Sequence, residues 1–338
     1  AIQIAKANHP DIKHIGNVKH LRFAPMEGIS SMIRMHNFCD DTAEDYFDTA
    51  IYNIDLMVGG FPCQSFSIAG NRKGLEDDRG QLFFDLLRIL DQVKPKYFLF
   101  ENVASMSKAN QAFISEKLGV EPIMINSALV TAQQRKRLYW TNIPDIQQPK
   151  DKEIYLKDIV EDIVDEKYFI RNATLTLNDG NANNNAPIRV GFFNKGGQGD
   201  RVYSLEGKSV CLSANGGGRG AKTGLYAIAQ RGRNIVNGKR RDIKGAKTEQ
   251  RFETSYSEKS NYLTSVQKDS LLLEAETDNY IIRKLTVNES CRLQGFPDDY
   301  FLNKDGGKIV SNTQAYKGLG NGFTVPIIKH ILQHFNLN

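Results

Sequence analysis

The stretch "IDLMVGGFPCQSFSIAG", residues 54–70, decides the fold and raises the question of chemistry. Residues 54–58 form a short, mostly apolar run that is typical of a buried strand, and two glycines, a phenylalanine and a proline separate it from Cys63. In open α/β sheets, ligands bind beyond the carboxyl ends of the strands. Cys63 lies just past one such end, so it is either an inert buried thiol or a nucleophile.

The residues after this stretch alternate between helical and strand patterns. The pattern predicts a helix from Gln81 to Val93, a strand from Tyr97 to Phe100, a polar helix over 110–118, and strands near 123–125 and 138–140. Such alternation predicts an α/β fold in which a mostly parallel, doubly wound, Rossmann-like sheet carries helices on both faces. Residues 1–150 would form this domain.

Composition and cysteine spacing exclude several classes of protein. The 338 residues are 40% hydrophobic, which is enough for a large core. No apolar run approaches the roughly 18 residues that span a bilayer, and the N-terminus lacks a secretory signal, so we expect a cytoplasmic protein with no membrane partner. The four cysteines, Cys39, Cys63, Cys211 and Cys291, have no regular spacing, so neither a disulfide framework nor a metal site is predicted.

Residues 151–280 have a different character. Stretches such as "NDGNANNN" and "SANGGGRGAKTG" predict a separate domain that is rich in loops and short strands. This region carries a basic cluster, which is either a solvated loop or a contact surface for a polyanion: Arg231, Arg233, Lys239, Arg240, Arg241 and Lys244.

Regular patterns return in residues 281–338, the third segment. A helix is predicted after Thr286 as N-cap, with Glu289 closing a capping box and Gly295 ending the helix. A last helix is predicted from about Thr324, with Pro326 in its first turn.

Two further motifs bear on the chemistry of Cys63. The strand ending in "FENV" would bring Glu101 to the same sheet edge as Cys63, although a glutamate at a strand end also suits a structural ion pair. Arg135 and Arg137 occupy alternate positions and would point to one face of a strand, either as part of a site or as surface charge. A cysteine protease would need a histidine, and the six histidines lie toward the two ends without a local signature.

Five stretches together resemble a known family. They are "GGFPCQSFSIAG" (59–70), "FENV" (100–103), Gln-x-Arg-x-Arg (133–137), "RKLTVNESCRLQGFPDDY" (283–300) and "GLGNGFTVPII" (318–328). In order and spacing they resemble the motifs of DNA cytosine carbon-5 methyltransferases of the bacterial or phage restriction-modification type. The resemblance implies a catalytic domain over 1–150, a target-recognition domain over 151–280 and a return to the catalytic domain over 281–338.

The resemblance also implies a mechanism. Cys63 matches the family's nucleophile, which adds to carbon 6 of a cytosine flipped out of a specific duplex DNA sequence. Glu101 matches the residue that holds the base at N3 and N4, Arg135 the arginine beside the ring and phosphate, and Arg137 its partner that orients the carboxylate. The methyl donor would be S-adenosylmethionine. Residues expected to contact DNA are Gln64, Ser65, Ser67, Arg79, Arg231, Arg233, Arg240 and Arg241.

The cofactor positions that the resemblance implies are Asn17, Pro62, Leu82, Asn321 and Gly322. The glycine-rich turn with which the family begins does not occur in this sequence, which opens on "AIQIAKANHP", a pattern predicting a helix. We therefore expect the chain, as written, to bind S-adenosylmethionine weakly or not at all by itself. It would act as a monomer or together with a polypeptide that supplies the missing motif.

Two alternatives to a DNA methyltransferase associated with the bacterial nucleoid stay open on sequence. One keeps the chemistry and changes the substrate to transfer RNA. The other is a non-catalytic DNA-binding subunit of a split enzyme. The long basic insertion favours duplex DNA, and the sequence does not reveal which bases are read.

Overall fold

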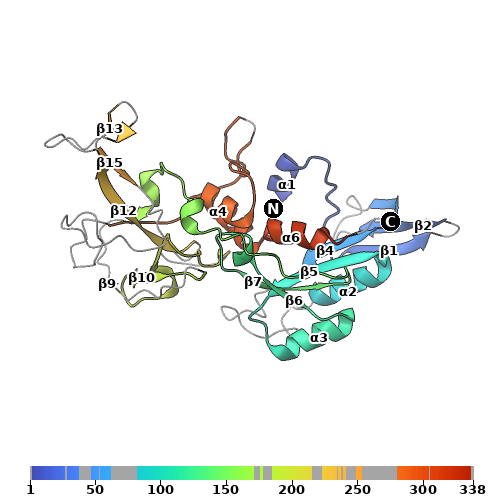
Figure 1. Ribbon diagram of the computed structural model, residues 1–338. Helices are drawn as coiled ribbons and strands as arrows, with labels where there is room; N and C mark the ends of the chain where they lie inside the picture. The colour runs from blue at the N-terminus through green and yellow to red at the C-terminus, as the bar shows by residue number, and fades with distance from the viewer. Residues whose placement is uncertain are drawn as a thin grey trace.

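The structure, a computed structural model, has three larger sheets and one two-stranded ribbon in its described residues, together with six α-helices (Figure 1). Within the described residues, no helix has the length and apolar character that crossing a lipid bilayer requires. The residues that the structure describes are 2–26, 29–37, 47–52, 54–61, 82–170, 176–177, 185–214, 223–233, 235–236, 239–240, 249–252, 280–303 and 305–335.

The central sheet has four described strands in the order β4-β5-β7-β6. They are β4 (Leu56–Gly60), β5 (Tyr97–Val103), β7 (Lys136–Thr141) and β6 (Ile123–Asn126). β4 and β5 are parallel, whereas β7 is antiparallel to both of its neighbours. β4, β5 and β6 thus run in one direction, so the described sheet is mostly parallel as the sequence predicts. β7 runs the other way, because residues 127–135 are too few for a crossover and instead reverse the chain.

Helices cover both faces of the central sheet, as the sequence predicts. α2 (Leu82–Val93) and α3 (Lys108–Leu118) pack on one face, where Phe100 and Trp140 are fully buried. α6 (Val325–Leu332) packs on the other face, against Leu99 and Tyr139. Neighbouring residues of a strand point to opposite faces, so β5 and β7 each feed two cores. Each such buried side chain contributes about 1.5–3 kcal/mol, and the α/β fold class is confirmed.

The N-terminal part forms elements of which the sequence predicted only the first helix. α1 (Ile2–Asn8) is followed by an antiparallel sheet, the N-terminal sheet, in the order β1-β2-β3. Its strands are β1 (Leu21–Met26), β2 (Ile29–Asn37) and β3 (Phe47–Tyr52). Leu21 and Phe23 of β1 pack on Ile89 and Val93 of α2, which attaches this sheet beside the central one.

The second sheet stands at the opposite end of the molecule from the N-terminal sheet (Figure 1). Its order is β8-β16-β12-β11-β10-β9, with β15 paired to β12, and β13 and β14 form a small separate ribbon. The strands are β8 (Phe169–Ile170), β9 (Thr176–Leu177), β10 (Arg189–Phe192), β11 (Arg201–Ser204), β12 (Leu225–Arg233), β13 (Ile235–Val236), β14 (Lys239–Arg240), β15 (Glu249–Phe252) and β16 (Tyr280–Arg283). Short 3-10 helices lie at Ser127–Leu129, Leu156–Asp158, Glu166–Tyr168 and Gln198–Asp200.

The C-terminal helices join the second sheet to the central one. In α4 (Val287–Gln294) the capping box of Thr286 and Glu289 is present and Gly295 ends the helix at φ 77°, as predicted. α6 carries its proline in the first turn, also as predicted. α5 (Asn312–Asn321) was not predicted; its buried Leu319 packs in one core with Leu293 of α4 and Leu205 and Leu212, which follow β11.

Candidate active site

Glu101 lies where β4 and β5 end side by side. Gly60, the last residue of β4, is the strand partner of Glu101. The next residue of the motif, Asn102, is buried and donates from its side-chain nitrogen to the carbonyl of Phe61 at 3.3 Å. The segment that leads to Cys63 therefore leaves the sheet beside Glu101, although Cys63 itself lies outside the described residues.

Space beside the Glu101 carboxyl depends on Gly60. A Cβ atom at this position would already stand 3.5 Å from Glu101 Oε2 and 3.8 Å from the ring of Phe323. Any longer side chain would extend into the same space. The glycine therefore leaves the carboxyl open on this side, and it brings the loop after α5 close to the end of β4.

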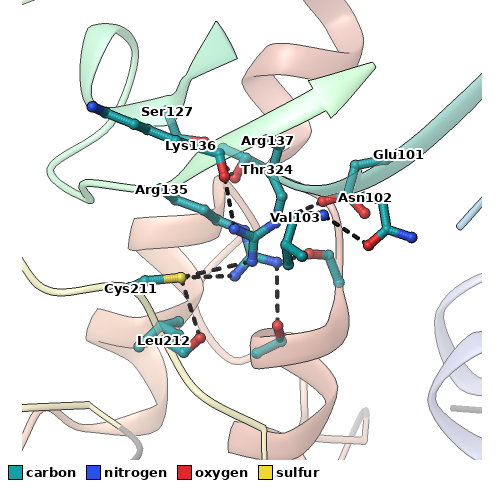
Figure 2. Close-up of polar contacts among 12 residues, drawn as sticks. Glu101, Asn102, Val103, Ser127, Arg135, Lys136, Arg137, Cys211, Leu212 and Thr324 are labelled. Atoms are coloured by element: carbon teal, nitrogen blue, oxygen red, sulfur yellow. Dashed lines mark hydrogen bonds and ion pairs between the residues drawn. The ribbon is translucent and has the colours of Figure 1, made fainter. Parts of the chain in front are cut away.

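Arg137 is the ion-pair partner of Glu101. Its Nε lies 2.8 Å from Glu101 Oε1, and both side chains are 13% exposed. Its Nη1 donates to the carbonyl of Lys136 at 2.9 Å, which fixes the guanidinium against its own strand. Figure 2 shows the two side chains reaching toward each other from β5 and β7.

Burial dominates the protonation of Glu101. Desolvation raises the pKa of Glu101 above its ordinary value, while the positive charges of Arg137 and Arg135 oppose the rise. A carboxyl in this state keeps its proton to a higher pH than an ordinary glutamate does. It is therefore suited to give a proton to, or share one with, a bound group.

Arg135 has a different environment. It is 3% exposed, and its Nη2 donates to the carbonyls of Gly320 at 3.2 Å and Gly322 at 3.0 Å. Its Nη1 approaches the sulfur of Cys211 at 3.3 Å, and Arg137 Nη2 approaches the same sulfur at 3.7 Å. The two arginines thus point to one side, as their alternate spacing predicts. The guanidinium of Arg135 is occupied in holding the last turn of α5 and Gly322, which follows it.

Gln133, the first residue of the Gln-x-Arg-x-Arg motif, is also part of this junction. It is fully buried, and neither its Oε1 nor its Nε2 has a hydrogen-bond partner within the described part of the chain. Its backbone forms a parallel bridge with Ser209. The motif thus places Gln133 against the segment after β11, Arg135 against the end of α5, and Arg137 at the Glu101 carboxyl.

The expected cofactor residues are spread over several elements. Leu82 is the half-buried first residue of α2, and Asn321 is the exposed last residue of α5. Gly322 follows it and gives its carbonyl to Arg135. Asn17 is exposed in the turn before β1, where its Oδ1 accepts the backbone N–H of Lys19 at 3.1 Å. The structure does not bring Asn17 to the site around Glu101.

Other predicted residues cannot be placed by their side chains. Arg231 and Arg233 lie in β12 and Arg240 in β14, where the backbone alone is described. The residues outside the described segments are Pro62, Cys63, Gln64, Ser65, Ser67, Arg79 and Arg241. Within the described residues, no group of three or more His, Cys, Asp or Glu is arranged to hold a metal ion.

Sequence reasoning missed three residues at this junction: Asn102, Cys211 and Gly320. Asn102 belongs to the "FENV" motif, so its position beside Glu101 was a usable signal. Cys211 and Gly320 carry no local signature, because their contacts join segments that are far apart in sequence.

Comparison with known proteins identifies relatives of the chain. A family model described as C-5 cytosine-specific DNA methylase matches residues 31–336. The type II methyltransferase M.HhaI of Haemophilus parahaemolyticus is 30% identical over 298 residues, which cover 82% of this chain and 74% of the relative. The orphan methyltransferase M.SPRI of Bacillus phage SPR is 29% identical over 360 residues, covering 82% of each chain.

A third relative and one solved structure complete the comparison. The type II methyltransferase M.HpaII of Haemophilus parainfluenzae is 30% identical over 296 residues, which cover 81% of this chain and 70% of the relative. Among solved structures, the S. pombe Dnmt2 methyltransferase matches with a TM-score of 0.47 and 17% identity, over 84% of this chain and 79% of that one.

Proposed function

We propose, from the premise that this chain belongs to the family of C-5 cytosine-specific DNA methylases, that it methylates carbon 5 of a cytosine flipped out of duplex DNA. The observation that carries the proposal is the buried carboxyl of Glu101, paired with Arg137 at the strand edge from which the Cys63 segment departs. A flipped base is required because an atom inside the duplex is out of reach of a side chain.

The proposed reaction begins with Cys63. Its thiolate forms a bond to carbon 6 of cytosine, and the electron pair displaced from the ring double bond is stabilised when Glu101 gives its proton to N3. Carbon 5 of this enamine would then take a methyl group from the donor, whose methyl–sulfur bond breaks so that the sulfonium leaves as a neutral thioether. Loss of the proton on carbon 5 to a base expels the thiolate, restores the ring double bond and lets N3 return its proton to Glu101.

The arginines have separate roles in this proposal. Arg137 orients the Glu101 carboxyl through the Nε contact, and its charge limits how far burial raises the pKa of Glu101. Arg135 fixes the end of α5 through the carbonyl of Gly320 and the residue after the helix through the carbonyl of Gly322. This division differs from the expectation that Arg135 lies beside the ring and phosphate.

The methyl donor is proposed to be S-adenosylmethionine, which when bound supplies an electrophilic methyl group. The described residues that would hold it meet near the end of β4, where a Cβ atom on Gly60 would stand 3.5 Å from Glu101 Oε2 and 3.8 Å from the ring of Phe323, the residue after Gly322. Leu82 and Asn321 are proposed as further contacts, with Pro62 joining them from the segment before Cys63. Asn17 stays a proposed contact to the adenine: its side-chain oxygen accepts the backbone N–H of Lys19, and its second lone pair and its amide N–H groups remain for a ligand.

DNA contacts are proposed for two regions. Gln64, Ser65, Ser67 and Arg79 would contact phosphates around the flipped base. The second sheet would read the sequence, as part of a recognition domain over 151–280, while 1–150 and 281–338 form the catalytic domain. DNA binding by the recognition domain would weaken as the salt concentration rises, because its basic residues would neutralise phosphates. These residues are Arg231, Arg233, Arg240 and Arg241.

The test is hydrogen exchange at carbon 5, which requires the thiolate and the proton donor but no methyl donor. The chain is incubated with duplex DNA that carries tritium on carbon 5 of cytosine, and released tritium is counted. Release is expected with the chain and with Cys291→Ala, a matched loss of a thiol that is buried in α4, and not with Cys63→Ser. Transfer RNA labelled in the same way serves as the second polymer.

A covalent complex gives the second readout. Duplex DNA containing 5-fluorocytosine, incubated with S-adenosylmethionine in large excess and with the chain extended by a segment that supplies the glycine-rich turn, should give a complex that survives denaturation and depends on Cys63. Preference for transfer RNA in the exchange assay would move the proposal to that substrate. Absence of exchange and of the covalent complex with both polymers would overturn it.

A further inference from the structure

Cys211 is a contact between the second sheet and the residues around Glu101. It belongs to the segment 208–214, which follows β11 and runs beside residues 131–137. The backbone of Ser209 accepts from Gln134 at 3.0 Å and donates to Ala132 at 2.7 Å. The segment is thus attached to the chain just before β7, and the sulfur of Cys211 is held opposite the arginines.

The sulfur meets both guanidinium groups. Arg135 Nη1 lies 3.3 Å away and Arg137 Nη2 lies 3.7 Å away, and the sulfur in turn approaches the carbonyl of Leu212 at 3.5 Å (Figure 2). Two positive groups so close together repel each other, and a polarisable acceptor between them reduces that repulsion. The sulfur therefore favours an arrangement in which both arginines stay on this side of the strand.

Arg137 is held at all three of its nitrogens. Nε meets Glu101, Nη1 meets the carbonyl of Lys136, and Nη2 meets Cys211. The backbone contact fixes one edge of the guanidinium, and the sulfur fixes the opposite edge. Without the sulfur, Nη2 loses its partner among the described residues, and the plane of the guanidinium is free to turn away from the carboxyl.

The neighbouring residues tighten the same contact. A Cβ atom at Gly320 would stand 2.5 Å from the backbone nitrogen of Ala214 and 2.7 Å from the carbonyl carbon of Ser213, so the segment presses directly on this glycine. Gly320 also gives its carbonyl to Arg135. The segment 208–214 thus makes two contacts here. Cys211 contacts the two arginines, and Ser213 and Ala214 press on Gly320, whose carbonyl Arg135 holds.

We propose that Cys211 is a positioning residue for methyl transfer, whose sulfur holds Arg137 against Glu101 and thereby couples the segment after β11 to the proton donor. The inference rests on the proposed function. Cys211 contacts the arginines and does not itself have to touch the substrate. A change in how the second sheet engages DNA would reach the carboxyl by this route.

The test compares Cys211→Ala, which removes the acceptor, with Cys211→Ser, which keeps one. For Cys211→Ala we expect kcat for methylation and the tritium exchange rate to fall about tenfold, the equivalent of ~1.4 kcal/mol, with KM for DNA within about twofold of wild type. The pH at which the rate falls with rising pH should move upward, because a loosened Arg137 no longer opposes the raised pKa of Glu101. Cys211→Ser should recover most of the rate.

The control is Cys291→Ala, which removes a buried thiol elsewhere and should leave both the rate and the pH profile unchanged. Wild-type kcat and pH profile in Cys211→Ala would overturn the inference, as would a lower rate with an unshifted profile, since that pattern marks a merely structural role. If Cys211→Ala does not fold, the inference is overturned by a wild-type rate and an unshifted pH profile in Cys211→Thr, whose added methyl displaces the acceptor; Cys211→Ser should stay near wild type in both. Loss of exchange in the wild-type chain would instead refute the proposed function.

Discussion

Glu101 and Glu289 are both glutamates paired with an arginine; the Glu101 side chain is 13% exposed and that of Glu289 is fully buried, and they differ in how completely their oxygens are used. Each oxygen of Glu289 accepts one bond from Arg283, at 2.6 and 2.7 Å, and one backbone N–H, from Glu161 or Thr286, at 2.8 Å. Glu101 has a single such contact within the described residues, from its Oε1 to Arg137.

The difference separates a structural pair from the pair to which we assign a function. Buried polar groups are normally satisfied, and Glu289 meets that rule with four bonds at the start of α4. The second oxygen of Glu101 faces the space beside Gly60, and burial raises the pKa of this carboxyl. A carboxyl oxygen that is not already bonded can bind a substrate. Substitution of Glu101 should therefore lower activity and spare stability, whereas substitution of Glu289 should lower stability and spare activity.

The largest effect is expected for Glu101→Gln. The amide cannot give a proton to N3, so kcat for methylation should fall by about 10²–10⁴, the usual range for loss of an acid–base group. The wild-type rate should fall as pH rises through the raised pKa of Glu101, and the residual rate of the variant should lack this fall. Steady-state methylation, followed from about pH 5 to about pH 9, measures the loss of kcat and its dependence on pH.

The stability of Glu101→Gln sharpens the comparison. Because the pKa of Glu101 is raised in the folded state, its contribution to stability is present at low pH and is lost as pH rises through that pKa. The free energy of unfolding at neutral pH should therefore not decrease in the variant. A clear decrease would mean that the carboxylate is a structural partner of Arg137 after all.

Glu289→Gln should do the reverse. It leaves Arg283, which is 2% exposed, with an uncompensated charge in the core, a change that typically costs about 3–5 kcal/mol. Chemical denaturation should show this loss, while kcat per folded molecule stays near wild type. A drop in kcat as large as that of Glu101→Gln would erase the distinction between the two pairs.

The comparison also shows what the sequence could predict. Thr286 and Glu289 were identifiable because a capping box is a local pattern, and Glu101 because a strand end positions it. α5 was missed because Gly318 and Gly320 are poor helix formers, and burial of residues such as Leu319 stabilises the helix instead.

Other features left no local pattern to find. β8 and β9 of the second sheet, and β13 and β14 of the small ribbon, are only two residues long, too short to show a period of two. β1 contains a proline, which disfavours a strand, and its packing on α2 overrides that preference. The proposed role of Cys211 arises from a contact with residues more than seventy positions away in the sequence. Residue type alone also does not distinguish an asparagine that closes a turn, as Asn17 does, from one that contacts a ligand.

Lys208 is a third buried charge and provides an intermediate case. Its Nζ donates to the carbonyls of Ile154 at 2.6 Å, Ala128 at 2.8 Å and Thr131 at 3.4 Å, joining the second sheet to the loop before β7. Lys208→Met keeps the length of the side chain and leaves these carbonyls without their donor, so the free energy of unfolding should fall by about 2 kcal/mol.

Since Lys208 attaches the segment that carries Cys211, its loss should also affect the arginines. We expect Lys208→Met to lower kcat less than Cys211→Ala does, because Arg137 keeps its own contacts. Lys208→Arg, which retains the charge, is the matched control for stability. Equal stability of the wild type and Lys208→Met in denaturant would show that the three carbonyls find other donors.

The smallest effect is expected at Cys291, where the buried group is neutral. Burial, together with the charges of Asp298 and Asp299, raises the pKa of the Cys291 thiol to about 12. A raised pKa in the folded state means that stability is fully present below the pKa of the unfolded chain, near 9.0, and is lost as pH rises from there toward 12.

Cys291→Ala removes this dependence. At pH 7, taken as roughly neutral, the variant should be less stable than wild type by about 1 kcal/mol from lost burial, and guanidinium denaturation near pH 10 should show the difference shrinking by up to about 1.4 kcal/mol per pH unit. A stability difference that stays constant over this range would mean that the Cys291 thiol ionises as easily in the folded chain as in the unfolded one.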